Sequence, residues 1–213
     1  LNHRDQRLAN GGNQFSLEPP DQGLCVGNGF TVEAVNSVLR VWSSASGAAL
    51  TGGQDLNTFF GYPAASNRAT GVVGPTVIEP VCHYDPERQR FVVAITTLFV
   101  DANGDFNGKN TIDVAVSNTG DPRGAWTIYH VPAQNDGTDG TPDHGCKDDE
   151  GAHGPCFQDY PHIGGDAHRG YITTNENDLF GNGLHRPPTF AFSKGRAAPP
   201  PPRAPASPAG RLS

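Results

Sequence analysis

Short apolar runs separated by turn-forming residues dominate the chain between residues 23 and 193. Within residues 111–118, Ile112, Val114 and Val116 alternate with small or polar residues, which is the period of a strand with two different faces. Asn-Gly, Asn-Ser and Ser-Gly dipeptides separate the first few runs, and these residues favour tight turns. No long segment shows helical periodicity with capping residues. We therefore predict an all-β fold.

The predicted strands form three successive groups, two with four strands and one with three. Four-stranded units repeated in tandem are the blades from which β-propellers are built. A β-sandwich also has short strands and frequent turns and is the alternative. Repetition of whole units favours a partial propeller of about two and three-quarter blades. The predicted strands span residues 23–27, 30–35, 38–43 and 48–52, then 77–84, 90–100, 111–118 and 126–133, then 161–165, 171–175 and 189–193.

Two flanking segments differ in composition from this region. Residues 1–22 lack regular alternation, and we predict an extended N-terminal segment. Residues 194–213 contain only Lys, Gly, Arg, Ala, Pro, Ser and one Leu, a composition that favours extended polyproline geometry over a packed core. We therefore predict a propeller-type region at 23–193 followed by a disordered tail. Because the tail interrupts a strand-like segment, we expect a natural truncation or out-of-frame translation rather than a spacer or cell-wall linker.

Charge and composition exclude several classes of protein. The formal net charge is −7 at pH 7, so the chain offers no basic face to phosphates and we expect no nucleic-acid partner. No run approaches the roughly 18 consecutive apolar residues of a membrane-spanning helix. The chain has 27 Gly and 19 Pro among 213 residues, which fits a turn-rich β protein.

Four strings of the chain carry a family resemblance. They are FSLEPPDQGLCVGNGF, EPVCHYDPERQRFVVAI, DVAVSNTGDPRGAWTIYHVP and GPCFQDYPHIGGDAHRGYITTNE. Together they resemble a largely uncharacterised family of secreted bacterial β-propeller proteins, sometimes labelled sialidase-like. The resemblance extends over residues 9–193, and it implies a secreted protein of which this chain is a partial propeller.

A polar loop carries two of the four cysteines. Cys146 and Cys156 have nine residues between them, and in an exported chain this arrangement favours a disulfide that closes the loop. The alternative is a zinc site, because His144 and His153 would add two imidazoles to the two thiolates. The spacing matches no standard zinc finger.

The other two cysteines, Cys25 and Cys82, occupy matching positions in the first strands of the first two groups. In a propeller those strands are neighbours, so a second disulfide would be possible. Two buried free thiols are an equally ordinary outcome.

The segment 101–108 places side-chain oxygens at alternate positions. Asp101, Asn103, Asp105 and Asn107 have the spacing with which calcium loops collect oxygen ligands. It is not an EF-hand, because Phe106 stands where that loop requires Gly. The alternative is a solvated hairpin connection, for which Asp, Asn and Gly are also the preferred residues.

Three acidic residues, Asp21, Glu79 and Asp159, each stand just before the first strand of a group. If those strands line a central channel, the three carboxylates gather at one mouth of it. Such a cluster can bind sugar hydroxyls or a cation, or carry out acid–base glycosidic chemistry. The alternative is that each carboxylate caps backbone N–H groups.

The sequence contains no Gly-x-Ser-x-Gly, phosphate-binding loop or His-Glu-x-x-His motif. Its Thr119-x-Asp121-x-x-Gly124-x-Trp126 string resembles the Asp-box of sialidases, which is a structural hairpin and not a catalytic device. We therefore expect an extracellular module that binds a carbohydrate or another cell-envelope component without catalysis. A fragment of a sialidase-like glycoside hydrolase is the alternative.

Overall fold

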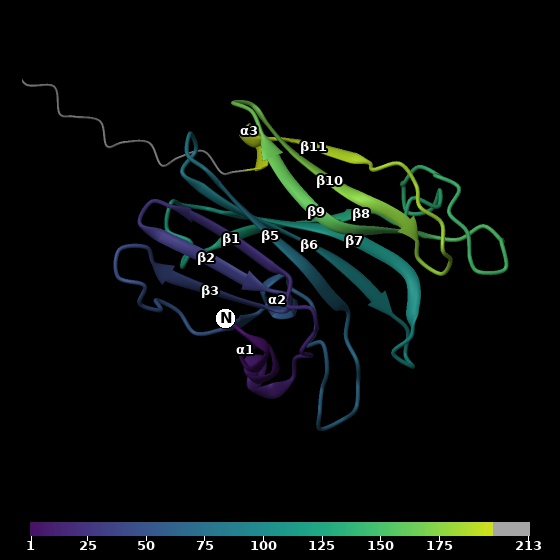
Figure 1. Cartoon of the computed structure of the whole chain (residues 1–213), viewed down its shortest axis with the longest axis horizontal. Helices are drawn as coiled ribbons and strands as arrows, with labels where there is room; N and C mark the ends of the chain where they lie inside the picture. Colours follow the sequence, from purple (N-terminus) through teal and green to yellow (C-terminus); the bar gives the residue numbers. More distant parts are fainter. Residues whose placement is uncertain (198–213) are drawn as a thin grey trace, which may run out of the picture.

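The computed structural model describes residues 1–197 and consists mainly of three antiparallel sheets, none of them closed (Figure 1). The predicted all-β class and the grouping into four, four and three strands are confirmed. Sheet 1 holds β1 (Gln22–Gly27), β2 (Phe30–Val35), β3 (Val38–Ser43) and β4 (Gln54–Asp55). Sheet 2 holds β5 (Thr76–Asp85), β6 (Arg90–Val100), β7 (Phe106–Ser117) and β8 (Trp126–Pro132). Sheet 3 holds β9 (Cys156–Gly165), β10 (Arg169–Asp178) and β11 (Thr189–Ser193).

The fourth strand of sheet 1 lies a few residues later than the sequence predicts. Within the predicted strand 48–52, Ala49 makes only an isolated bridge to Trp42. The side-chain oxygen of Thr51 accepts the Val41 N–H at 3.0 Å, so this side chain replaces a backbone partner at the edge of β3. A regular ladder with β3 resumes only at β4.

Sheet 2 lies between the other two sheets, and its strand β6 is buried on both faces. Phe91, Val93 and Ile95 belong to the hydrophobic core shared with sheet 1. The alternate residues Val92 and Ala94 belong to a second core shared with sheet 3. The strict alternation of side-chain direction along a strand therefore allows one strand to serve two cores.

The first strands of the three sheets are neighbours: β1 contacts β5, and β5 contacts β9 (Figure 1). The Cys25–Cys82 disulfide joins β1 to β5. Gly27 lies against the ring of Tyr84, so closely that an added Cβ would stand 2.3 Å from it. The acidic residues that precede or interrupt these three strands are thereby brought to one region of the molecule.

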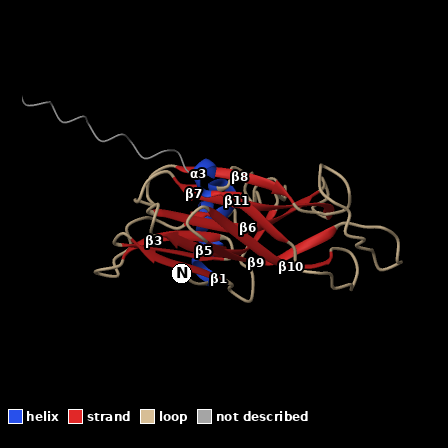
Figure 2. Ribbon diagram, turned by 90° about the horizontal axis from the view of Figure 1, so that it is seen from above, coloured by secondary structure: helices blue, strands red, loops and turns tan. Residues whose placement is uncertain are grey.

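The helices are short beside the strands (Figure 2). The N-terminal segment, predicted to be extended, instead contains α1 (His3–Leu8) and the 3-10 helix η1 (Ala9–Gly12). A reciprocal capping box between Asn2 and Asp5 stabilises the start of α1. The other helices are α2 (Leu56–Phe59) and α3 (Lys194–Ala197).

Helix α3 occupies the first residues of the tail that we predicted to be disordered, and residues 198–213 lie outside the described residues. Among residues 1–197, no helix combines the length and apolar character needed to cross a membrane.

Candidate functional site

The structure brings the three acidic residues Asp21, Glu79 and Asp159 together. The side chain of Glu79 is hydrogen-bonded to that of Asp159, and Asp21 is close enough to repel its charge. Asp21 directly precedes β1 as predicted, whereas Glu79 and Asp159 lie inside β5 and β9. Glu79 lies within the strand predicted at 77–84, and β9 begins earlier than the predicted 161 because its pairing with β10 extends across an irregular position.

Unusual backbone conformations set the direction of the carboxyl side chains in this cluster. Strand β5 is irregular between Ile78 and Val81, and Glu79 has φ of 57°. Tyr160, which follows Asp159, has φ of 49°. Two such non-glycine residues cost about 1–3 kcal/mol each, so the surrounding contacts must hold them in place.

Two hydrogen bonds provide that support. The Glu79 N–H donates to Oδ1 of Asn36 at 3.3 Å, and Oε2 of Glu79 accepts the Tyr160 N–H at 2.5 Å. The second bond joins the two residues of left-handed conformation directly. The bulged strands of sheets 2 and 3 are therefore fixed to each other at the carboxyl cluster.

The electrostatic environment favours the protonated form of Glu79. Burial raises its pKa, the hydrogen bond with Asp159 raises it further, and the charges of Asp159 and Asp21 act in the same direction. The Tyr160 N–H opposes this effect, and the resulting pKa is about 8. Glu79 therefore holds its proton to a higher pH than an ordinary glutamate does.

An exposed aromatic residue, Tyr160, follows Asp159 in β9, and its backbone N–H bonds to Glu79. The Tyr160 residue is 43% exposed, and its ring centroid lies 5.4 Å from that of His162. Sequence analysis did not select either residue. The signal was present in the Asp159-Tyr160 pair, because an exposed aromatic next to an acidic residue is a common composition for polar-ligand sites.

The predicted calcium loop forms the hairpin connection between β6 and β7. The Asp101 carboxylate accepts the N–H groups of Asn103 and Asp105 at 2.8 and 3.1 Å, and these bonds lower its pKa. The Asn107 amide donates to the Val100 carbonyl. The segment therefore has the geometry of the alternative interpretation, a hairpin connection whose side chains bond to its own backbone. Calcium binding by the loop stays a prediction.

Both cysteine pairs are disulfide-bonded. The predicted Cys146–Cys156 disulfide is confirmed, and Cys25 and Cys82 form the second disulfide rather than two free thiols. In this oxidised form the zinc alternative has no thiolates to bind the metal.

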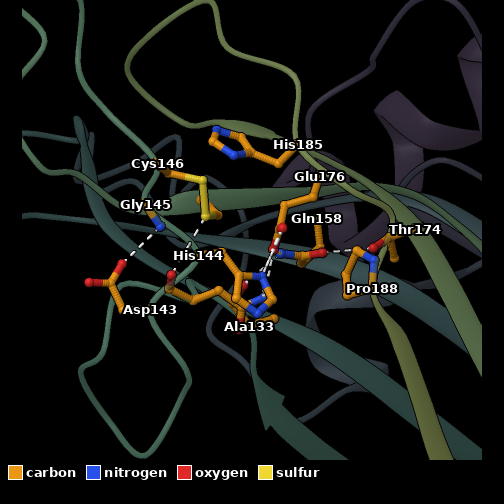
Figure 3. Close-up of polar contacts among 12 residues, drawn as sticks. Ala133, Asp143, His144, Gly145, Cys146, Gln158, Thr174, Glu176, His185 and Pro188 are labelled. Carbon is orange, nitrogen blue, oxygen red and sulfur yellow. Dashed lines mark hydrogen bonds and ion pairs between the residues drawn. A yellow bond between two sulfur atoms is a disulfide. The ribbon is translucent and has the colours of Figure 1, made fainter.

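The histidines of the zinc alternative contact carboxylates instead. Nδ1 of His144 lies 2.8 Å from Oε2 of Glu176, and Nε2 of His153 lies 3.1 Å from Oδ1 of Asp143. The Glu176 side chain is only 1% exposed, and Figure 3 shows it between His144 and Gln158. A further histidine–carboxylate pair, His185 with Asp178, lies nearby at 2.7 Å.

Sequence analysis also missed a buried polar network in sheet 2. The Asp113 side chain is fully buried and accepts hydrogen bonds from Tyr62 at 2.8 Å and Thr97 at 2.5 Å. Nδ1 of His130 lies 2.9 Å from its other oxygen. Burial and the Asp113 charge raise the pKa of Tyr62. Because both of its carboxylate oxygens have partners, Asp113 is suited to a structural role.

The string that resembles an Asp-box forms the turn between β7 and β8. Asp121 accepts the Arg123 N–H at 2.9 Å, and the Trp126 ring packs 5.4 Å from that of Phe59. These contacts shape a hairpin and anchor it to the core.

Comparison of the chain with protein-family models, with curated proteins and with solved structures finds no match.

Proposed function

We propose that the chain is part of an extracellular propeller-type module that binds a glycan of the cell envelope without turning it over. The observation that carries this proposal is the Glu79–Asp159 carboxyl pair, followed in the chain by the exposed residue Tyr160, whose backbone N–H bonds to Glu79. A sugar presents an apolar C–H face that packs on an aromatic ring. Its hydroxyl groups donate to carboxylates and accept from carboxylic acids.

The arrangement of the sheets supports the propeller part of this proposal. Each sheet follows the chain order without crossovers, as successive blades do, and the first strands of the sheets are adjacent. The resemblance to secreted propeller proteins and the Asp-box-like turn agree with it. In such an arrangement the carboxyl cluster lies where the innermost strands meet, which is the usual ligand-binding region of a propeller.

The two disulfides support an extracellular location, because disulfides persist in oxidising compartments and are rare in the cytosol.

The carboxyl geometry favours binding over hydrolysis. Glycosidases hold their two carboxyl groups about 5 Å or more apart, so that the scissile bond fits between them. Glu79 and Asp159 instead lie within hydrogen-bonding reach of each other, which is closer than the separation that glycosidases use. A sialidase-like hydrolase is therefore the second candidate, and the test below separates the two.

The test is a glycan array probed with the full chain, followed by calorimetric titration of the best ligands. We expect Tyr160→Ala to weaken binding about tenfold, because it removes the stacking surface. Asp159→Asn should weaken binding by removing a hydroxyl acceptor. Phe106→Ala is the matched control, because Phe106 is also 43% exposed and lies at the remote start of β7.

Unchanged affinity in the Tyr160→Ala variant, or no glycan bound at all, would contradict the proposal. Chromogenic glycosides provide the other arm of the test. Turnover that disappears in the Asp159→Asn variant would favour the hydrolase.

A further inference from the structure

Three potential metal-ligating side chains meet beside the polar loop. One ligand atom each from Cys146, Asp178 and His185 lies within 4.8 Å of the others. Within the described part of the chain, no other group of three His, Cys, Asp or Glu side chains meets this condition. Figure 3 shows the His185 ring beside the Cys146 disulfide. The cluster is separate from the Tyr160 site described above.

This corner is buried and already well ordered by hydrogen bonds. Cys146 is fully buried, and the side chains of Asp178 and His185 are 7% and 22% exposed. The Asp178 carboxylate accepts the N–H groups of Lys147 at 2.9 Å and Gly183 at 2.7 Å. An added Cβ on Gly183 would stand 2.5 Å from the carboxylate, so only glycine allows the backbone to approach this closely.

We propose that reduction of the Cys146–Cys156 disulfide converts this corner into a zinc site. Three ligands are the Cys146 thiolate, the imidazole of His185 and the carboxylate of Asp178, which already lie together. The fourth is the Cys156 thiolate, which lies outside that group and moves in from its position beside Cys146 once the disulfide is broken. Thiolate, imidazole and carboxylate are the ligand types that Zn²⁺ takes in proteins, and four of them complete its tetrahedral shell.

The contacts of the oxidised form indicate how the metal is accommodated. Nε2 of His185 and Oδ1 of Asp178 are 2.7 Å apart and share a proton. A zinc ion takes the place of that proton and needs these two atoms to separate by only a fraction of an ångström. The backbone bonds to Lys147 and Gly183 remain and orient the carboxylate as outer-shell partners.

The redox step needs an external dithiol. Its two thiols transfer two electrons and two protons to the Cys146–Cys156 bond, giving two protein thiols and one disulfide in the reductant. Zinc binding then releases both thiol protons to solvent.

This site differs from the zinc alternative drawn from sequence spacing, which used His144 and His153. Those imidazoles already contact Glu176 and Asp143, whereas His185 lies next to the sulfur. The spacing argument missed His185 and Asp178, because β10 and the loop that follows it bring them to the cysteines from a distant part of the sequence.

The test is a Co²⁺ titration of the full chain after reduction by a dithiol and removal of that dithiol without oxygen. We expect one Co²⁺ per chain, with thiolate charge-transfer absorption that Zn²⁺ abolishes. The oxidised chain should give no such absorption. His185→Gln and Asp178→Asn should bind at least about tenfold more weakly.

Two kinds of control variant assign the ligands. His144→Gln and His153→Gln should bind Co²⁺ as tightly as the wild-type chain does. The double variant Cys25→Ser/Cys82→Ser should keep the absorption, because its thiolates come from the other pair. Absence of thiolate absorption in the reduced chain, or unchanged affinity in both the His185 and Asp178 variants, would overturn the proposal.

Circular dichroism covers the case in which the reduced chain loses its structure. Zn²⁺ should then restore the native spectrum and raise the melting temperature of the wild-type chain but not of the His185→Gln variant. Failure of Zn²⁺ to restore the wild-type spectrum would equally overturn the proposal.

Discussion

Glu79 and Asp159 lie in the first strands of two different sheets, and their side chains are hydrogen-bonded to each other. A residue with left-handed backbone conformation accompanies each of them. Glu79 itself has a positive φ, and so does Tyr160, which follows Asp159. The site is thus built by two sheets together, because the first strands of neighbouring sheets contact each other.

The raised pKa of Glu79 predicts how stability depends on pH. The folded chain holds a proton on Glu79 up to about pH 8, whereas the unfolded chain releases it near pH 4.5. The folded state binds more protons in this window, so the contribution of Glu79 to stability falls as pH rises from 4.5 to 8. We expect Glu79→Gln, which cannot ionise, to melt about 2–4 °C above the wild-type chain at pH 8.5 and to show a smaller difference at pH 5.

Thermal unfolding at both pH values measures this effect. Glu87→Gln is the matched control, because Glu87 is exposed in the β5–β6 turn and should shift the melting temperature little. Equal pH dependence in the Glu79→Gln variant and the wild-type chain would contradict the prediction.

The contact of Gly27 with Tyr84 predicts a specific packing defect. An alanine Cβ at position 27 would overlap the ring, and such overpacking costs about 1–3 kcal/mol. Gly52→Ala is the control, because nothing lies within 4 Å of its added Cβ and its φ is not positive. Urea unfolding should show a lower midpoint for Gly27→Ala alone, and two equal midpoints would argue against the close contact.

The Cys25–Cys82 disulfide links sheets 1 and 2 and joins two residues that are 57 positions apart in the sequence. The double variant Cys25→Ser/Cys82→Ser should lose about 2–5 kcal/mol of unfolding free energy, because the unfolded chain gains freedom and the link between β1 and β5 is lost. Urea unfolding under non-reducing conditions measures this loss. A variant as stable as the wild-type chain would show that packing alone joins the two strands.

Removal of the buried Asp113 carboxylate should destabilise the fold strongly. Asp113→Ala leaves the Tyr62 and Thr97 hydroxyls without their acceptor, at a cost of about 3 kcal/mol. Tyr62→Phe removes one donor only and should cost about 1 kcal/mol. Asp105→Ala, at an exposed position, serves as the control in chemical unfolding. The free energy of unfolding should fall most in Asp113→Ala, less in Tyr62→Phe and least in Asp105→Ala. Any other order would contradict the structural role of Asp113.

Local sequence patterns predicted most strands because alternation and turn residues act within a few positions. The Asn28-Gly29 turn is an example, since both residues adopt the positive φ that the dipeptide favours. The helix at residues 3–8 was missed because it depends on one capping box rather than on an apolar face.

The candidate site could be predicted only in part. Equivalent positions in the repeats indicated that Asp21, Glu79 and Asp159 would meet, and they do. The bulges at Glu79 and Tyr160, and the partners Glu176, Asp178 and Asp113 of the histidines, depend on pairing between distant segments. Neither strand alternation nor motif spacing carries that information.

The burial of β6 on both faces has a consequence for dynamics. Its amide hydrogens can exchange with solvent only when sheet 1 and sheet 3 both separate from sheet 2, because β6 contributes to both cores. We therefore expect the slowest-exchanging amides in residues 91–98, at a rate set by global unfolding. The three sheets would then open as one cooperative unit, even though each is formed by its own segment of the chain.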